Sequence, residues 1–218
     1  MIRRIISMVM IVLFSLAFIS GAPAQEREME VVNWDFDVYL NDKKVGKHSF
    51  TVSEADGMKR VQSDANFNVK FLFMSAYRYE HSAAERWSEN CLVEFDASTN
   101  ANGKHFQISG EQTGAGFVVE SGASPIELPE CVMTFAYWNP EFLEQPRLLN
   151  PQTGEYVDVR VEELGNELLE VRGQQVAATR FNLTASEVDL TLWYSSDDEW
   201  LALQSVANGG QIIRYELS

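Results

Sequence analysis

Most of the chain beyond residue 30 alternates between apolar and polar positions with a period of two, as in β-strands that bury one face. The longest such stretch is Arg60–Phe73. One face carries Val61, Ala65, Phe67, Val69, Phe71 and Phe73, with Ser63 as a polar member. Fourteen residues at about 3.3 Å each would extend for roughly 46 Å, longer than a usual strand. We therefore expect this strand to bend or coil, as in a sheet that wraps around something.

Shorter alternating runs predict the other strands. Residues 34–40 and 45–52 flank a turn sequence and indicate a hairpin, in which Gly46 marks a bulge or a close approach of another strand. Five prolines punctuate an irregular middle region with a short helix near residues 140–145. Strands then resume at residues 155–163, 167–171, 176–183, 188–194, 200–207 and 211–217, with Gly165-Asn166 as one of the turns. The fold prediction is a single all-β domain of about ten antiparallel strands, forming a curved sheet or an incomplete barrel with a short helical or irregular segment.

The N-terminus has the pattern of an export signal. Arg3 and Arg4 precede an apolar run, and Ala22-Pro23-Ala24 supplies small residues before a cleavage site. The apolar run is about 15 residues, shorter than the roughly 20 needed to span a bilayer. We expect residues 1–24 to be a signal peptide cleaved after Ala24 and residues 25–218 to be an exported domain in the periplasm. No cysteine near the cut offers a lipid anchor; an uncleaved membrane anchor is the alternative, and no other run is long enough to span a membrane.

The charge disfavours several classes of partner. The chain has 17 Lys and Arg against 32 Asp and Glu, a net charge of −15. Cleavage after Ala24 would leave 194 residues with a net charge of −17. Nucleic acid needs clustered Lys and Arg, and anionic lipid surfaces attract basic segments, so we expect neither as a partner.

Export also gives a meaning to the two cysteines, Cys91 and Cys131. An oxidising compartment favours a disulfide between them. The alternative is a reactive thiol or a metal ligand, but neither cysteine has a nearby histidine or a second cysteine at metal-ligand spacing. The prediction is a structural Cys91–Cys131 disulfide.

The motifs of nucleophilic, metal-dependent and nucleotide-dependent enzymes are missing from the sequence, so we expect no cofactor and no metal site. The best enzyme-like group is His81, with Glu80 beside it and Glu85 four residues on, as a general base with an orienting carboxylate. In a strand, however, Glu80 and His81 face opposite sides, and His81 and Glu85 lie about 13 Å apart. A solvated or hydrogen-bonded histidine is the alternative, and a catalytic role is the less favoured one.

Aromatic residues are numerous, with 13 Phe, 7 Tyr and 5 Trp. If the sheet wraps only part of the way around, its concave face forms an apolar cleft. The candidate ligand-binding residues are Phe67, Phe71, Phe73, Tyr77, Tyr79, Tyr137 and Trp138. The alternative is that these rings fill the core. Residues 135–142 form either a lid over the cleft or a plug in an open barrel end.

Several strings in the chain are characteristic. They are Glu85-Arg86-Trp87 with Cys91-Leu92, Thr99-Asn100-Ala101-Asn102-Gly103, Ala136-Tyr137-Trp138-Asn139, Leu149-Asn150-Pro151-Gln152-Thr153-Gly154, and Leu192-Trp193-Tyr194 with Trp200. They resemble an uncharacterised family of exported bacterial proteins, a domain of unknown function, over nearly the whole mature chain. The resemblance implies a fold similar to periplasmic domains with a curved antiparallel sheet, including the lipoprotein-carrier half-barrels. It implies no catalytic or binding residues.

Three functional hypotheses follow. The first is a soluble periplasmic binding or carrier protein for an apolar or lipid-like ligand, without catalysis. The second is an acidic structural or interaction module of the cell envelope that binds a basic partner protein or divalent cations. The third is a cofactor-free enzyme that acts on a small molecule or a lipid.

Overall fold

The computed structural model describes residues 29–71, 74–122, 124–186, 188–207 and 210–218; the predicted signal peptide lies outside them. These residues form fifteen β-strands and one short 3₁₀ helix. The all-β prediction is confirmed, but the expected number of about ten strands is too low. Three of the strands, β8, β9 and β10, have three residues each, too few to show an alternating pattern.

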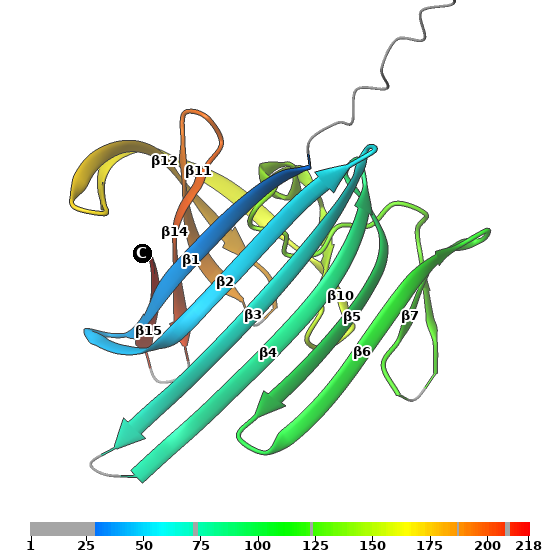
Figure 1. The fold of residues 1–218 in the computed structure, drawn as a ribbon, viewed down its shortest axis with the longest axis horizontal. Helices are drawn as coiled ribbons and strands as arrows, with labels where there is room; N and C mark the ends of the chain where they lie inside the picture. Colours follow the sequence, from blue (N-terminus) through cyan, green and yellow to red (C-terminus); the bar gives the residue numbers. More distant parts are fainter. Residues whose placement is uncertain (1–28, 72–73, 123, 187, 208–209) are drawn as a thin grey trace, which may run out of the picture.

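Thirteen strands form one curved antiparallel sheet that does not close, with β11 and β8 at its two edges. The first part is a meander of eight strands: β1 (Glu30–Leu40), β2 (Lys43–Ala55), β3 (Met58–Phe71), β4 (Met74–Ser88), β5 (Cys91–Ala101), β6 (Lys104–Thr113), β7 (Gly116–Glu120) and β8 (Ile126–Leu128). The second is a meander of five: β11 (Arg160–Val171), β12 (Gln174–Thr184), β13 (Asp189–Ser195), β14 (Trp200–Ala207) and β15 (Gln211–Leu217). Figure 1 shows the long β1–β6 strands running side by side.

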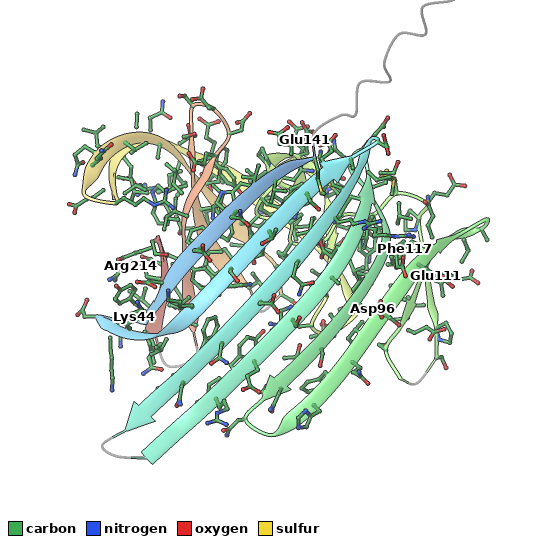
Figure 2. All side chains as sticks on the ribbon, viewed as in Figure 1. Lys44, Asp96, Glu111, Phe117, Glu141 and Arg214 are labelled. Atoms are coloured by element: carbon green, nitrogen blue, oxygen red, sulfur yellow. A yellow bond between two sulfur atoms is a disulfide. The ribbon has the colours of Figure 1, made fainter. Side chains whose placement is uncertain are left out.

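The two meanders are joined by pairing between β1 and β15, the first and last strands in the sequence. Phe36 of β1 lies opposite Leu217 of β15. Beyond the strand ends, the backbone N–H of Ser218 donates to the carbonyl of Asp35 at 2.8 Å. Figure 2 shows Arg214 of β15 near the β1–β2 turn, and its Nη1 donates to the carbonyl of Asn41 at 3.3 Å. The N-terminal and C-terminal strands of the domain therefore lie next to each other in the sheet.

Inward-facing side chains form rows that cross the strands of the first meander. One row, fixed by the strand register, is Trp34, Phe50, Ser63, Ala83, Ala97 and Ile108. All six side chains are buried. The residues immediately before and after each of them on the same strand are more exposed. The predicted alternation around Arg60–Phe73 is thus confirmed in β3, although Phe73 and the side chain of Phe71 lie outside the described part.

Two glycines explain local irregularities in the sheet. A Cβ on Gly46 would lie 1.9 Å from the carbonyl oxygen of Asn66, so β2 and β3 approach closely there. The β1–β2 register also shifts between Val38 and Tyr39, as expected for a bulge near Gly46. The expected turn at Gly165-Asn166 is wrong. Gly165 has a φ of +91° and lies at a register shift inside the continuous strand β11, because a glycine with positive φ suits a bulge as well as a turn.

Residues 129–159, here called the inner segment, lie on the concave side of the sheet (Figure 1). The inner segment contains the 3₁₀ helix η1 (Pro140–Glu144), as expected near Pro140, and the hairpin of β9 (Arg147–Leu149) and β10 (Tyr156–Asp158). Its apolar side chains join the core of the sheet: Val132, Met133, Phe142, Leu148 and Leu149 are each at most 2% exposed. The inner segment is therefore mainly a plug that occupies most of the space on the concave side of the sheet.

A disulfide between Cys91 and Cys131 attaches the inner segment to the start of β5, as predicted. Beside it, the backbone N–H of Leu92 donates to the carbonyl of Val132 at 3.0 Å. The bridge closes a loop of 40 residues. It thereby anchors the plug to the sheet near the point where the inner segment begins. No helix in the described part of the chain is long and apolar enough to cross a membrane.

Candidate functional site

The inner segment does not fill the concave side completely. A cavity of about 400 Å³ remains between it and the sheet. The lining residues belong to three walls. The wall from the first meander is His48, Phe50, Val61, Ser63, Phe67, Tyr77, Tyr79, His81, Ala83 and Glu85; the wall from the second meander is Val188, Leu190, Leu203, Ser205, Ile213 and Tyr215; the inner segment adds Thr134, Phe135, Ala136, Tyr137, Trp138, Asn150, Pro151 and Gln152. Ligand pockets in proteins have volumes of roughly 300–1,000 Å³, so this cavity is large enough for a small molecule.

Five of the seven aromatic residues selected from the sequence line this cavity: Phe67, Tyr77, Tyr79, Tyr137 and Trp138. The other two, Phe73 and the side chain of Phe71, lie outside the described part of the chain. Trp138 is buried at 8% exposure, whereas Tyr77 is 40% exposed. Tyr77 therefore marks the rim through which the cavity meets solvent. Trp138 also belongs to the buried core cluster and Tyr137 packs against that cluster, so both residues contribute to the core as well as to the cavity wall.

The aromatic rings of the first meander pack against those of the second across the cavity floor. Phe67 stacks on Tyr79 with ring centroids 5.2 Å apart, and its edge faces Tyr215 at 6.2 Å. On the side of the inner segment, Tyr137 packs on Trp200 at 5.1 Å. Aromatic pairs at these separations stabilise one another beyond simple burial. The apolar wall is therefore held in place by ring contacts between the two meanders and with the inner segment.

Two histidines lie in one inward-facing row of the sheet, in which Ala65 separates His48 on β2 from His81 on β4. Nε2 of His48 lies 2.8 Å from the hydroxyl of Ser63, and its Nδ1 lies 3.2 Å from the hydroxyl of Tyr215. Nδ1 of His81 lies 2.8 Å from the hydroxyl of Thr99.

Burial lowers the pKa of both histidines, because a charged imidazole is poorly solvated in the interior. The pKa of His48 falls to about 3, through burial first and then through the nearby His81. Burial also lowers the pKa of His81 below its ordinary 6.5, although Asp64 opposes the shift. Both imidazoles are therefore neutral at pH 7 and act as hydrogen-bonding groups rather than as positive charges.

A carboxyl group lies at the other end of the same wall. Glu85 is buried, and its two oxygens accept hydrogen bonds from the indole N–H of Trp87 at 2.9 Å and from the hydroxyl of Thr134 at 3.2 Å. Burial raises the pKa of Glu85 to about 7, and the two hydrogen bonds oppose that shift. The salt bridges found among the described residues do not include Glu85. The cavity thus contains a carboxyl group without a cationic partner among those residues.

His81 and Glu85 do not form the pair that a general base with an orienting carboxylate requires. Both face inward from β4, whereas Glu80 is exposed on the other face. His81 bonds to Thr99, and Glu85 bonds to Trp87 and Thr134. Four residues of extended strand span about 13 Å, so the side chains of His81 and Glu85 do not meet. Among the described residues, no group of three His, Cys, Asp or Glu side chains is placed to hold a metal ion.

Several polar lining residues were not selected from the sequence. His48 lies on the apolar face of β2, two residues before Phe50, and Ser63 interrupts the apolar face of β3. A polar residue at an inward position of an alternating strand is a readable signal for both. Thr134 has no such signal, because long-range folding brings it to the cavity from the inner segment. Tyr215 shares one face of β15 with Ile213 and Leu217, but no local pattern shows that this face meets His48.

Comparisons with known proteins agree with this architecture. A family model described as a domain of unknown function (DUF6134) matches residues 36–218. A search of the curated proteins found no match. Among solved structures, the fold is similar to a crystal structure of a β-barrel-like protein with domain of unknown function DUF1849 from Brucella abortus, with a TM-score of 0.63 and 7% sequence identity. That similarity covers 85% of this chain and 94% of the other, and at this identity it establishes the fold alone.

Proposed function

The chain belongs to the DUF6134 family, a domain of unknown function, and we propose that it is a soluble periplasmic binding or carrier protein for an apolar or lipid-like ligand. The observation that carries the proposal is the cavity between the concave sheet and the inner segment. Phe67, Tyr79 and Tyr137 would contact the apolar body of the ligand, and the exposed Tyr77 would lie at the entrance.

The construction of the inner segment supports a preformed binding site. The hydroxyl of Thr134 donates to Glu85 on β4, and the hydroxyl of Tyr194 on β13 donates to the carbonyl of Tyr137 at 2.8 Å. The cavity wall on that side is therefore attached to both meanders. A wall that does not need to be ordered upon binding reduces the entropic cost of association.

The location in the periplasm is part of the proposal and depends on the predicted signal peptide in residues 1–24. The Cys91–Cys131 disulfide supports it, because stable disulfides form in oxidising compartments. A carrier there would shield the apolar part of its ligand from water, while a net charge of −17 on the mature chain would keep the complex dispersed.

Binding of the neutral fluorescent probe N-phenyl-1-naphthylamine tests this function. Ala83 lines the cavity, and its neighbour Ala84 is exposed on the outer face of the same strand. Ala83→Trp fills the cavity and is expected to reduce probe binding at least tenfold, whereas Ala84→Trp should leave it within twofold. Circular dichroism checks that each variant is folded. Ser205→Phe, on the opposite wall, gives a second blocked cavity if Ala83→Trp does not fold. Equal probe binding by the wild type and both blocked variants would contradict the proposal.

A second candidate function, an interaction module for a basic partner protein, is favoured by the β11–β12 hairpin. Figure 1 shows this hairpin at the edge of the fold, and β11 is a free edge strand. Leu168 on β11 is 69% exposed, and Glu163 and Glu170 on the same strand are exposed as well. Partner binding through this hairpin would disappear at about 0.5 M salt, because exposed charges are screened there. Leu168→Ser would weaken it without affecting the probe in the cavity.

A further inference from the structure

The charges around the cavity are one-sided. Glu85 is the one acidic residue among the described lining residues, and none of those residues is Lys or Arg. His48 and His81, the two basic side chains in the lining, are engaged in hydrogen bonds to hydroxyl groups and are neutral at pH 7. Among the described lining residues, the side chain that can carry a charge at neutral pH is therefore the acidic Glu85.

The described residues provide Glu85 with two hydrogen-bond donors but with no positively charged partner. Its hydrogen-bond donors, the Trp87 indole and the Thr134 hydroxyl, are both neutral. Each occupies one of the two carboxyl oxygens, and an ionised carboxyl has about four lone-pair sites in total. A buried carboxylate is costly unless it is paired with a positive charge. A cation in the cavity would remove that cost.

The rings around the cavity suit the same kind of ligand. Phe67, Tyr79, Tyr137 and Trp138 all line it. The faces of such rings carry partial negative charge and attract organic cations within about 6 Å. Trp138 already makes one such contact: Nζ of Lys59 lies 5.8 Å from its ring centroid, although Lys59 is neither a lining residue nor in a salt bridge with Glu85.

From these observations we propose that the ligand is an organic cation, an apolar molecule with a single amine or quaternary ammonium group that lies near Glu85. This inference rests on the proposed binding function and narrows it to one ligand class. An anionic headgroup, such as the carboxylate of a fatty acid, would meet the negative charge of Glu85 without a Lys or Arg among the described lining residues to compensate for it. A neutral headgroup would bond to His48, Ser63 and His81 and would make no use of Glu85.

Three probes with the same ten-carbon tail distinguish these cases: decyltrimethylammonium, decyl sulfate and decanol. Their affinities for the full mature protein are measured by calorimetry at pH 8, where Glu85 is largely ionised. The concentrations stay below the micellar concentrations of the two surfactants and below the solubility limit of decanol. About 0.3 M salt suppresses adsorption to the acidic surface. The matched variants are Glu85→Gln in the cavity and Glu80→Gln, which removes an exposed carboxylate from the outer face of the same strand.

The expected order is decyltrimethylammonium tighter than decanol, and decanol tighter than decyl sulfate. Glu85→Gln should weaken the ammonium probe at least tenfold and leave decanol within twofold, and Glu80→Gln should change neither. Equal loss of all three probes in Glu85→Gln, or equal affinities of the wild type for all three, would overturn the inference while leaving the binding function intact. If the wild type bound none of the three, the inference would be wrong, and the proposed function would be wrong as well if N-phenyl-1-naphthylamine did not bind either.

Discussion

The hydroxyl of Thr134 donates to Oε1 of Glu85 across a sequence separation of 49 residues and connects the inner segment to β4. Both residues are buried, so removing the hydroxyl would leave a largely desolvated carboxyl with one hydrogen-bond donor fewer.

Thr134→Val is therefore expected to reduce the free energy of unfolding by about 1–3 kcal/mol, because it keeps the side-chain shape and leaves a buried acceptor less satisfied. Urea denaturation measures this difference. Thr153→Val, at an exposed threonine of the same segment, is the control and should cost less than about 0.5 kcal/mol. Equal effects of the two substitutions would show that the Thr134–Glu85 bond contributes nothing to stability.

The protonation of Glu85 should appear in the pH dependence of stability. The pKa of Glu85 is about 7 in the folded protein, whereas its ordinary value, which applies to the unfolded chain, is 4.5. Between pH 4.5 and pH 7 the folded protein therefore binds more protons than the unfolded chain. The contribution of Glu85 to stability is fully present below pH 4.5 and is lost as the pH rises through 7, by roughly 3 kcal/mol in total.

Glu85→Gln lacks this titration. The free energy of unfolding of Glu85→Gln, minus that of the wild type, should therefore increase by roughly 3 kcal/mol between pH 4.5 and pH 8. Denaturation curves of both proteins over this range measure the difference, in which the titration of His48 cancels. A difference that stays constant with pH would contradict the raised pKa of Glu85.

Much of the sheet was predictable because its signal is local. The alternation in β3, the disulfide between the two cysteines and the short helix at Pro140 follow from neighbouring residues or from composition, and all three were confirmed. Local signals are less informative where a bulge intervenes. Arg86 and Trp87 pair with Glu94 and Leu92, so Val93 is an extra residue, and Leu92 and Phe95 are both buried despite their odd spacing.

The site was only partly predictable. Phe67, Tyr77 and Tyr79 could be predicted from the sequence, because aromatic residues at alternate positions of a strand share one face. The cavity, in contrast, depends on how closely the inner segment packs against the concave face of the sheet. Contacts such as the bond from Tyr194 to Tyr137 determine that depth, and their partners are distant in the sequence. Neither the pairing of β1 with β15 nor the meeting of Tyr215 with His48 has a counterpart in any short stretch of sequence.

The close approach of β2 and β3 at Gly46 predicts a strong effect of a small side chain. A Cβ there would lie 1.9 Å from the carbonyl oxygen of Asn66, so the strands would have to separate. Gly46→Ala should destabilise the protein by about 1–3 kcal/mol or more. Gly114→Ala adds the same methyl group where no atom lies within 4 Å, and should change the free energy of unfolding by less than about 0.5 kcal/mol. Thermal denaturation compares them, and a neutral Gly46→Ala would show that the two strands are further apart.

The disulfide should contribute substantially to stability. For the 40-residue separation of Cys91 and Cys131, the chain-entropy argument gives about 4 kcal/mol. The double variant Cys91→Ser with Cys131→Ser should lose about that amount in urea denaturation. A thiol assay on protein purified from the periplasm, denatured without reductant, should find almost no free thiol. Two titratable thiols per chain would show that the bridge is not formed in the cell.

The account as a whole depends on whether the cavity between the sheet and the inner segment is a binding site. Native mass spectrometry of the mature protein, purified from the periplasm without detergent, tests this most directly. We expect a bound small molecule on the wild type and on Ala84→Trp, and its absence from Ala83→Trp, whose indole would occupy the cavity. A ligand-free mass for the wild type, combined with no uptake of N-phenyl-1-naphthylamine, would contradict the account.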